Sequence, residues 1–233
     1  MFANAEALLF DLDGTLIDSM PHHHDAWVRW HQRRDLTIDG PAFFAATAGR
    51  SNAEILADML PRLSGAEHVA MADEKEALYR EIAGPSLSLI AGADAFVGAA
   101  RNAGWRLAVC TASTPQNMAL AFERYAIDGW VETVVSPADH RFGGDPDERL
   151  RGKPHPDIFL EAARRLGVAA AACIVFEDAP LGIEAARRAG MRAVALTTTM
   201  AAEAFAGFDN VLTIVPDFVA LPLSILSRAN HHA

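Results

Sequence analysis

Short apolar runs alternate with longer amphipathic segments along most of this chain. The runs are rich in β-branched residues and have the length of buried strands, so each of them predicts a strand. The predicted strands lie at 7–10, 106–110, 133–135, 173–176 and 193–196.

Between these runs, apolar residues recur at three-to-four spacing, which predicts helices. Three of these helices end at a glycine, at Gly104, Gly167 and Gly190, placed to adopt the left-handed conformation that closes a helix. Strands that alternate with helices of this length form right-handed βαβ units and a parallel sheet. We therefore predict an α/β fold with a doubly wound, Rossmann-like parallel sheet.

A helical stretch after the first strand breaks this alternation. Helices are predicted at about 20–34, 51–60 and 66–83, with no convincing strand among them. A helical insertion between the first strand and the next βα unit explains this economically. Gly84, Pro85 and Gly92 suit hinge and turn positions near its end. The predicted domains are a core of 1–17 and 89–233 and a helical insert of 18–88.

Composition narrows the classes of partner. The 233 residues are 51% hydrophobic and 21% charged, an ordinary globular mixture. The formal net charge of −10 argues against a nucleic-acid or anionic-membrane partner, which requires a basic surface. No apolar stretch has membrane-spanning length, and no signal peptide is visible at the N-terminus. A cytoplasmic protein is expected; its oligomeric state is left open, and a monomer is compatible with the sequence.

The two cysteines, Cys110 and Cys173, each lie inside an apolar run. This placement predicts buried strand thiols in a reducing compartment, with neither a disulfide framework nor a cysteine metal site.

Polar residues follow the predicted strands where ligands collect in open α/β sheets, outside the carboxyl ends of the strands. Asp11 and Asp13 follow the first strand, Thr111 and Ser113 the second, and Glu177 and Asp178 the fourth, while Lys153 opens a helix. We therefore expect one site at this edge of the sheet.

The chemistry of such a site follows from its charges. Four carboxylates and one lysine repel strongly unless a cation joins them, and hard oxygen ligands select Mg²⁺ or Ca²⁺ and leave room for a phosphate. A carboxylate that attacks the phosphate forms an aspartyl-phosphate, and a second one can transfer protons. Thr111 and the backbone after it, at Ala112 and Ser113, can donate hydrogen bonds to phosphoryl oxygens, and Lys153 can neutralise charge.

Four motifs together resemble those of the haloacid dehalogenase (HAD) superfamily, in its order and spacing. They are "FDLDGT", the threonine after the second predicted strand, "GKPHPDIF" and "FEDAPLGIEAARRAGM". The resemblance covers nearly the whole chain, and the insert is similar to the helical cap of the β-phosphoglucomutase-like branch. It implies that Asp11 is the nucleophile and that Asp13 is the acid/base, whose backbone carbonyl also binds Mg²⁺.

The resemblance also implies that Thr111 and Lys153 bind the transferring phosphoryl group and that Glu177 and Asp178 complete the metal site. Members of the superfamily that dehalogenate or cleave phosphonates lack an aspartate at the position of Asp13. Phosphate-ester chemistry is therefore expected.

Simpler interpretations exist for each residue taken alone. Asp11 and Asp13 could lie in a solvated turn, and Lys153 could be a surface lysine. Thr111 could be a plain strand-end hydroxyl, and Ser113 could be the N-cap of a helix that begins at Pro115. Glu177 and Asp178 could cap a helix at 179–189, a role compatible with metal binding.

The insert supplies candidate substrate contacts. Three consecutive histidines on a helix point about 100° apart and cannot converge on one ion. The family register favours His23 and Trp27 as the residues that face the site, with His22 and His24 solvated. The stretch "AGRSNAEI" matches the place where related caps present specificity residues, here Gly49, Arg50, Ser51 and Asn52. Lys75 could reach the cleft or pair with glutamates on a solvated helix. A surface flap is expected in "HRFGGDPDERLRGKP", before Lys153.

The expected function is a Mg²⁺-dependent phosphatase that hydrolyses a small phosphorylated metabolite, a sugar or nucleoside phosphate, under a closing cap. A phosphosugar mutase is the alternative, although Asn52 stands where β-phosphoglucomutase has an arginine; Arg50 could substitute for it. A non-catalytic binding protein on this scaffold is a further alternative, but such a protein would be expected to have lost a motif residue.

Overall fold

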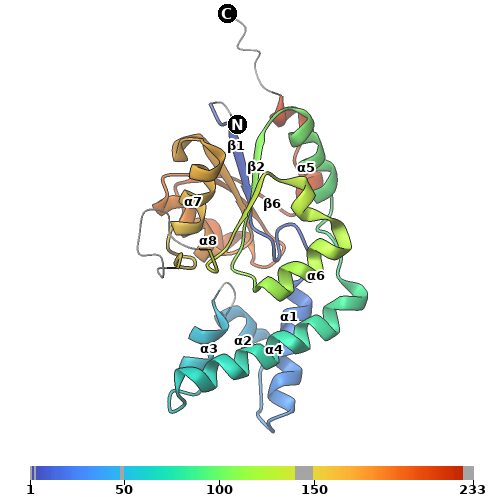
Figure 1. Cartoon of the computed structure of the whole chain (residues 1–233), viewed down its shortest axis with the longest axis vertical. Coiled ribbons are helices and arrows are strands. Elements are labelled where there is room, and N and C mark those ends of the chain that lie inside the picture. Colours follow the sequence, from blue (N-terminus) through green and yellow to red (C-terminus); the bar gives the residue numbers. More distant parts are fainter. Residues whose placement is uncertain (1, 3, 48–49, 140–148, 228–233) are drawn as a thin grey trace, which may run out of the picture.

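A six-stranded sheet with helices on both faces forms one end of the molecule, and four helices form the other (Figure 1). The computed structural model describes residues 2, 4–47, 50–139 and 149–227. The strands are β1 (Ala7–Phe10), β2 (Arg106–Cys110), β3 (Thr133–Val135), β4 (Cys173–Glu177), β5 (Arg192–Leu196) and β6 (Val211–Val215). Helices α5 (Ala93–Asn102), α6 (Pro115–Tyr125), α7 (Asp157–Leu166) and α8 (Pro180–Arg188) flank them. Short 3₁₀ helices span Ile127–Trp130, Ala170–Ala172, Ala202–Phe205, Phe218–Ala220 and Leu223–Leu226.

The sheet is parallel throughout, in the order β3-β2-β1-β4-β5-β6. The chain moves outward from β1 to β3 and then returns to β4, on the other side of β1. This reversal makes the gap between β1 and β4 the switch point at which ligands bind in doubly wound sheets. Phe10 pairs with Phe176, so the residues that follow these two strands emerge side by side.

Successive residues of the central strands pack into different cores. On β1, Leu8 and Phe10 face a core that includes Phe96 of α5, whereas Leu9 faces a core that includes Phe159 of α7. The two faces are covered by helices, which explains why the strand is apolar at every position instead of alternating.

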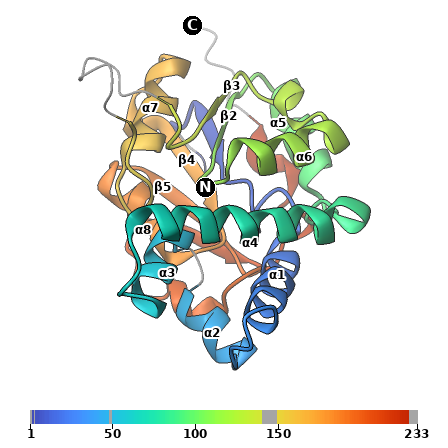
Figure 2. The same ribbon diagram turned by 60° about the horizontal axis from the view of Figure 1, so that its bottom comes forward.

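Helices α1 (Met20–Gln32), α2 (Gly40–Thr47), α3 (Asn52–Met59) and α4 (Gly65–Ser86) form the cap inserted after β1. Figure 2 shows α4 lying across the front of the molecule, between the other cap helices and the core. The chain enters and leaves the cap through paired segments. The amide of Asp18 donates to Ser88 O at 2.8 Å, and the amide of Ile90 donates to Leu16 O at 3.0 Å. The division at 17/18 and 88/89 stays a prediction, which this pairing supports.

A side-chain bridge also joins cap and core. Asn117 of α6 accepts a hydrogen bond on Oδ1 from Arg80 Nη1 at 2.9 Å and donates from Nδ2 to Glu76 Oε2 at 2.5 Å. Arg80 and Glu76 are both on α4, so one core amide is held on both sides by a single cap helix. This bridge is named the Asn117 bridge below.

The predicted strands are all present, with β4 reaching Glu177 and β5 beginning at Arg192. The sixth strand, β6, and helix α2 are absent from the prediction. Gly104, Gly167 and Gly190 have the expected positive φ, as does Gly92 in the turn before α5. The hinge expected at Gly84 and Pro85 is wrong, because both residues lie inside the last turns of α4.

The two cysteines are free and buried, in β2 and β4, as predicted. Among the helices of the described ranges, none combines the length and apolarity needed to cross a membrane. The flap expected before Lys153 falls largely on 140–148, and Gly49 also lies outside the described residues.

Candidate active site

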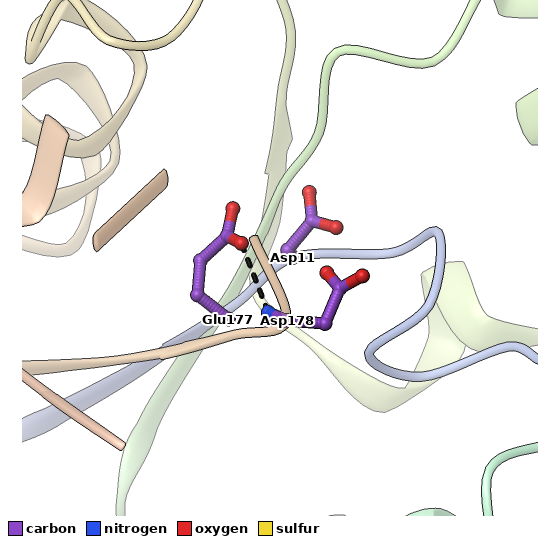
Figure 3. A group of neighbouring side chains, drawn as sticks. All are labelled: Asp11, Glu177 and Asp178. Carbon is purple, nitrogen blue, oxygen red and sulfur yellow. Dashed lines mark hydrogen bonds between the residues drawn. The ribbon is translucent and has the colours of Figure 1, made fainter. Parts of the chain in front are cut away.

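Three buried carboxyl groups meet where β1 and β4 end. Asp11 follows β1, Glu177 ends β4 and Asp178 comes next, and their exposed fractions are 6%, 1% and 2%. One oxygen from each lies within 4.8 Å of the others. In Figure 3 the carboxyl groups of Asp11 and Asp178 lie beside each other, while Glu177 folds back toward the amide of Asp178. The strand register thus brings together acids that are far apart in the sequence.

Both carboxyl oxygens of Glu177 have partners. Oε2 accepts hydrogen bonds from the amides of Asp178 at 3.0 Å and Ala179 at 2.9 Å, and Oε1 accepts from Lys153 Nζ at 2.5 Å. Gly182 makes room for this conformation, since a Cβ there would overlap the Glu177 carboxylate. Glu177 therefore fixes the turn after β4 and orients the lysine.

Lys153 lies between two of the acids. Its Nζ donates to Asp11 Oδ1 at 2.5 Å as well as to Glu177, and its side chain is 8% exposed. Burial alone would lower the pKa of Lys153, but the carboxylates of Asp11 and Glu177 outweigh burial and raise it. The lysine is therefore a fixed positive charge beside Asp11.

One ammonium group does not neutralise three buried acids. Burial, and then the charges of Glu177 and Asp178, raise the pKa of Asp11 well above its usual value despite Lys153. Burial and Glu177 likewise raise the pKa of Asp178 to about 7. A hard divalent cation would remove this repulsion, and an all-oxygen donor set suits Mg²⁺. The residues therefore fit a magnesium site in which Asp11 and Asp178 offer the carboxylates with free oxygens.

The residues Gly14 and Thr15 of "DLDGT" hold Asp178 in place. Thr15 Oγ1 donates to Asp178 Oδ1 at 3.1 Å. Gly14 has a φ of +75°, and a Cβ at this position would overlap the carboxylate of Asp178. The motif therefore needs a glycine both for its backbone conformation and for the space it leaves to the acid.

We expect Gly14→Ala to lower activity and stability together. The left-handed backbone costs a residue with a Cβ about 1–2 kcal/mol, and the displaced Asp178 would lower kcat/KM by about 10-fold or more. Gly104→Ala is the matched control, because Gly104 has a φ of +77° and open space around its Cβ position. It should lose similar stability in urea denaturation and keep its activity. An active Gly14→Ala enzyme would contradict this account of the motif.

Asp13 lies apart from the three acids and faces the cap. Ser19 Oγ donates to Asp13 Oδ1 at 2.7 Å, and His23 Nε2 lies 3.6 Å from the same oxygen. Lys75 Nζ lies 2.7 Å from His23 Nδ1. Because an ammonium can only donate, Nδ1 is the acceptor, which leaves the imidazole proton on Nε2, toward Asp13. Burial would raise the pKa of Asp13, but His23, Ser19 and Ser113 lower it to about 2.

The loop after β2 lies in the same cleft. Thr111 is buried, and its Oγ1 accepts a hydrogen bond from the amide of Ser113 at 3.0 Å. Thr111, Ala112 and Ser113 all line the cleft, together with Lys153 and the carboxylates. The N-cap of α6 is Thr114, whose side chain accepts from the amide of Asn117, so the N-cap alternative for Ser113 is wrong.

The cleft has a volume of about 640 Å³ and lies between core and cap. The predicted cap contacts all line it: His23, Trp27, Arg50, Asn52 and Lys75. Arg50 Nη2, however, pairs with Asp58 Oδ2 at 2.6 Å. The cleft therefore joins residues of both domains, as a capped site requires.

His22 and His24 are only partly exposed instead of fully solvated, and Lys75 follows the alternative in which it reaches the cleft. Lys75 is 2% exposed and bonds to His23 and Glu76, so it is no part of a solvated helix face. His22 is half-buried, with Nε2 2.9 Å from Ser86 Oγ. His24 stacks on Phe44 at a ring-centroid distance of 5.4 Å.

Comparison with known proteins identifies the family. The model of the haloacid dehalogenase-like hydrolases matches residues 5–190. The chain belongs to the haloacid dehalogenase-like hydrolases. The motif resemblance is thereby confirmed, and the fold agrees: a HAD hydrolase structure from Entamoeba histolytica is 27% identical, has a TM-score of 0.83, and covers 95% of this chain and 97% of its own.

Curated relatives of this HAD-like hydrolase carry out two kinds of phosphate chemistry. Validoxylamine A 7'-phosphate phosphatase of Streptomyces hygroscopicus subsp. limoneus is 32% identical over 204 residues, 88% of this chain and 91% of that protein. Beta-phosphoglucomutase of Bacillus subtilis is 30% identical over 198 residues, 81% of this chain and 82% of that protein. By their names, both relatives act on phosphate esters.

Sequence reasoning about this HAD-like hydrolase missed several residues of the site. Thr15 and Ser19 orient Asp178 and Asp13, and the signal for Thr15 was its place in "DLDGT". Glu76 and Asn117 also line the cleft. Only the tertiary fold brings these two together, because they lie 41 positions apart on different domains.

Proposed function

We propose that this HAD-like hydrolase is a Mg²⁺-dependent phosphatase of small phosphorylated metabolites, with Asp11 as its nucleophile. The observation that carries the proposal is the pairing of Asp11 with Lys153 and Asp178 on the floor of a capped cleft. Lys153 and a metal ion at Asp178 would offset the negative charge of Asp11 and of the substrate phosphate. The Asp11 carboxylate can then approach the phosphorus atom and attack it. The buried free thiols fit a reducing compartment, so we include a cytoplasmic location in the proposal.

In the first half of the reaction, an oxygen of Asp11 attacks phosphorus and the ester oxygen leaves. The bond formed is an acyl phosphate on Asp11, and the bond broken joins phosphorus to the leaving alcohol. Lys153 holds Asp11 and neutralises charge on the phosphoryl oxygens, and the Thr111 hydroxyl and the amide of Ala112 offer hydrogen-bond donors. The amide of Ser113 donates to Thr111 Oγ1 and so orients that hydroxyl. Mg²⁺, held by Asp11, Asp178 and the backbone carbonyl of Asp13, would supply Lewis-acid polarisation of the phosphoryl group when bound.

Asp13 is assigned to proton transfer. With a pKa of about 2 it is a carboxylate in the free site, ready to take a proton from the water that hydrolyses the acyl phosphate. In the first half-reaction it must instead donate a proton to the leaving alcohol. An approaching phosphate dianion raises the pKa of a nearby carboxyl group, which favours uptake of that proton on substrate binding.

The charges in the cleft favour hydrolysis over mutase activity. A mutase must hold a bisphosphorylated intermediate, which needs a second cationic site. Arg50, the residue that could substitute for the missing arginine at Asn52, is paired with Asp58 and half-exposed. Water is therefore the acceptor that this cleft suits best.

Phosphate release from a panel of sugar, polyol and nucleoside monophosphates, and from p-nitrophenyl phosphate, tests the proposal. We expect Mg²⁺-dependent release of inorganic phosphate from several members. Conversion of glucose 1-phosphate to glucose 6-phosphate that depends on added bisphosphate, with little free phosphate, would instead show a mutase. A folded protein that performs neither reaction would be a binding protein on this scaffold.

A further inference from the structure

A buried carboxylate lines the cleft on its cap side. Glu76 of α4 is 6% exposed and belongs to the wall of the cleft, yet the proposed mechanism does not use it. Its Oε1 accepts from Asn52 Nδ2 at 2.5 Å and from Lys75 Nζ at 2.9 Å, and its Oε2 accepts from Asn117 Nδ2 at 2.5 Å. A carboxylate offers about four acceptor positions, so the three donors leave one for a ligand.

Glu76 keeps its negative charge at neutral pH. Burial alone would raise its pKa, but the Lys75 ammonium and the Asn117 amide lower the pKa to about 2. A group that enters this part of the cleft therefore meets a buried carboxylate whose charge is balanced by the Lys75 ammonium 2.9 Å away. A hydroxyl group can donate a charge-assisted hydrogen bond to the remaining acceptor position of Glu76, whereas a phosphate dianion or a carboxylate has no proton to donate there.

The lysine and arginine side chains that line the cleft, in the part of the chain that the structure describes, are all paired already. Lys75 bonds to Glu76, Arg50 to Asp58, and Lys153 to Asp11 and Glu177. A phosphate or carboxylate on the leaving group would have to break one of these pairs to find a counter-charge. On the cap side of the cleft, a second anion would therefore compete with Glu76 for Lys75 or with Asp58 for Arg50.

We infer that Glu76 is a specificity-determining residue, which selects monophosphates whose leaving group carries hydroxyl groups and no second negative charge. This inference rests on the proposed phosphatase function and narrows its substrate class to phosphorylated sugars and polyols without further anionic groups. Glu76 binds a hydroxyl group of the leaving group through its remaining acceptor position. It disfavours bisphosphates and phosphorylated sugar acids, because their second anionic group cannot donate to Glu76 and must compete with a carboxylate for Lys75 or Arg50.

The test compares substrates that differ in one anionic group. Glucose 6-phosphate is paired with 6-phosphogluconate, and fructose 1-phosphate with fructose 1,6-bisphosphate, and p-nitrophenyl phosphate gives the reference rate without hydroxyl groups. In each pair, the neutral member is the substrate whose leaving group is uncharged, and the anionic member is the one whose leaving group carries a second negative group. The wild type should prefer the neutral member by about tenfold or more in kcat/KM. Glu76→Gln keeps the shape of the side chain and removes its charge, so this preference should fall to about threefold or less.

Glu81→Gln is the matched control, because Glu81 lies on the same helix and is exposed. It removes the same formal charge and should leave the preference unchanged. Thermal denaturation checks that each variant is folded. If Glu76→Gln does not fold, Asn52→Lys serves instead: it places a cation beside Glu76 and should raise kcat/KM for the anionic members alone.

Two results would overturn the inference while the proposed function stands. One is a wild type that hydrolyses neutral and anionic members equally well. The other is a Glu76→Gln enzyme that loses the same factor on every substrate, p-nitrophenyl phosphate included, since Glu76 would then only position Lys75. A wild type that hydrolyses nothing, even p-nitrophenyl phosphate, would overturn the proposed function itself and this inference with it.

Discussion

Asp11→Asn is expected to lower kcat/KM by about 10⁴-fold or more, because it removes the only oxygen nucleophile that the proposed reaction uses. The free energy of unfolding, in contrast, should not fall. The raised pKa of Asp11 means that ionising this carboxyl group costs more free energy in the folded protein than in the unfolded chain. That cost is present above the folded-state pKa, so the neutral amide should leave the protein at least as stable at high pH.

The two readouts are phosphate release and urea denaturation at pH 8. Asp25→Asn, at an exposed position of α1, is the control for loss of one aspartate and should retain full activity. Phosphorylation can be followed directly as well: substrate should leave a phosphoryl group on the Asp11 peptide of the wild type. An active Asp11→Asn enzyme would show that another group attacks phosphorus.

Removal of divalent cations should lower kcat/KM by about 10³-fold or more, and addition of Mg²⁺ should restore it. The physical reason is the repulsion between Asp11 and Asp178, which Lys153 leaves uncompensated. An ion that binds only the folded protein also stabilises it, by about 2.7 kcal/mol at a concentration 100 times its dissociation constant. We therefore expect Mg²⁺ to raise the melting temperature of the wild type.

Asp178→Asn separates metal binding from general stability. This variant removes one metal-type carboxylate and its repulsion with Asp11, so the protein should be stable without metal and should lose most of the stabilisation by Mg²⁺. Addition of K⁺ at matched ionic strength controls for simple screening of charge. An unchanged melting temperature of the wild type in Mg²⁺, with full activity in a chelator, would contradict a metal-dependent site.

The strand pattern predicted well which edge of the sheet carries the candidate site, and the reason lies in the strands themselves. Asp11 follows a strand that is apolar throughout, and Asp178 follows one that is apolar up to its last residue, Glu177. The carboxyl ends of parallel strands share one edge, so local patterns were enough to bring the two aspartates together. Lys153 was assigned to the same site because it lies in the motif "GKPHPDIF". The family match and the parallel sheet confirm the predicted family and fold, and the structure places Asp11, Asp178 and Lys153 together.

The cap side of the cleft was much harder to predict. Glu76 lies on a helix with many charged residues, where a glutamate is normally solvated, and nothing local shows that Asn117 and Asn52 cover it. Helix α2 is apolar on all sides and therefore lacks the periodic pattern that marks an amphipathic helix. Strand β6 is a different case, because its run "VLTIV" has a usable β-branched signal.

The Asn117 bridge has a consequence for the release of product. Its partners Arg80 and Glu76 belong to the cap, whereas Asn117 lies on the first turn of α6, six residues after Thr111. If the cap swings open, these bonds break and Glu76 meets water at the same moment as the cleft does. Hydration of the carboxylate then competes with its hold on the leaving alcohol. We therefore expect the alcohol to leave as the cap opens, so that the contact between α4 and α6 influences the rate of turnover.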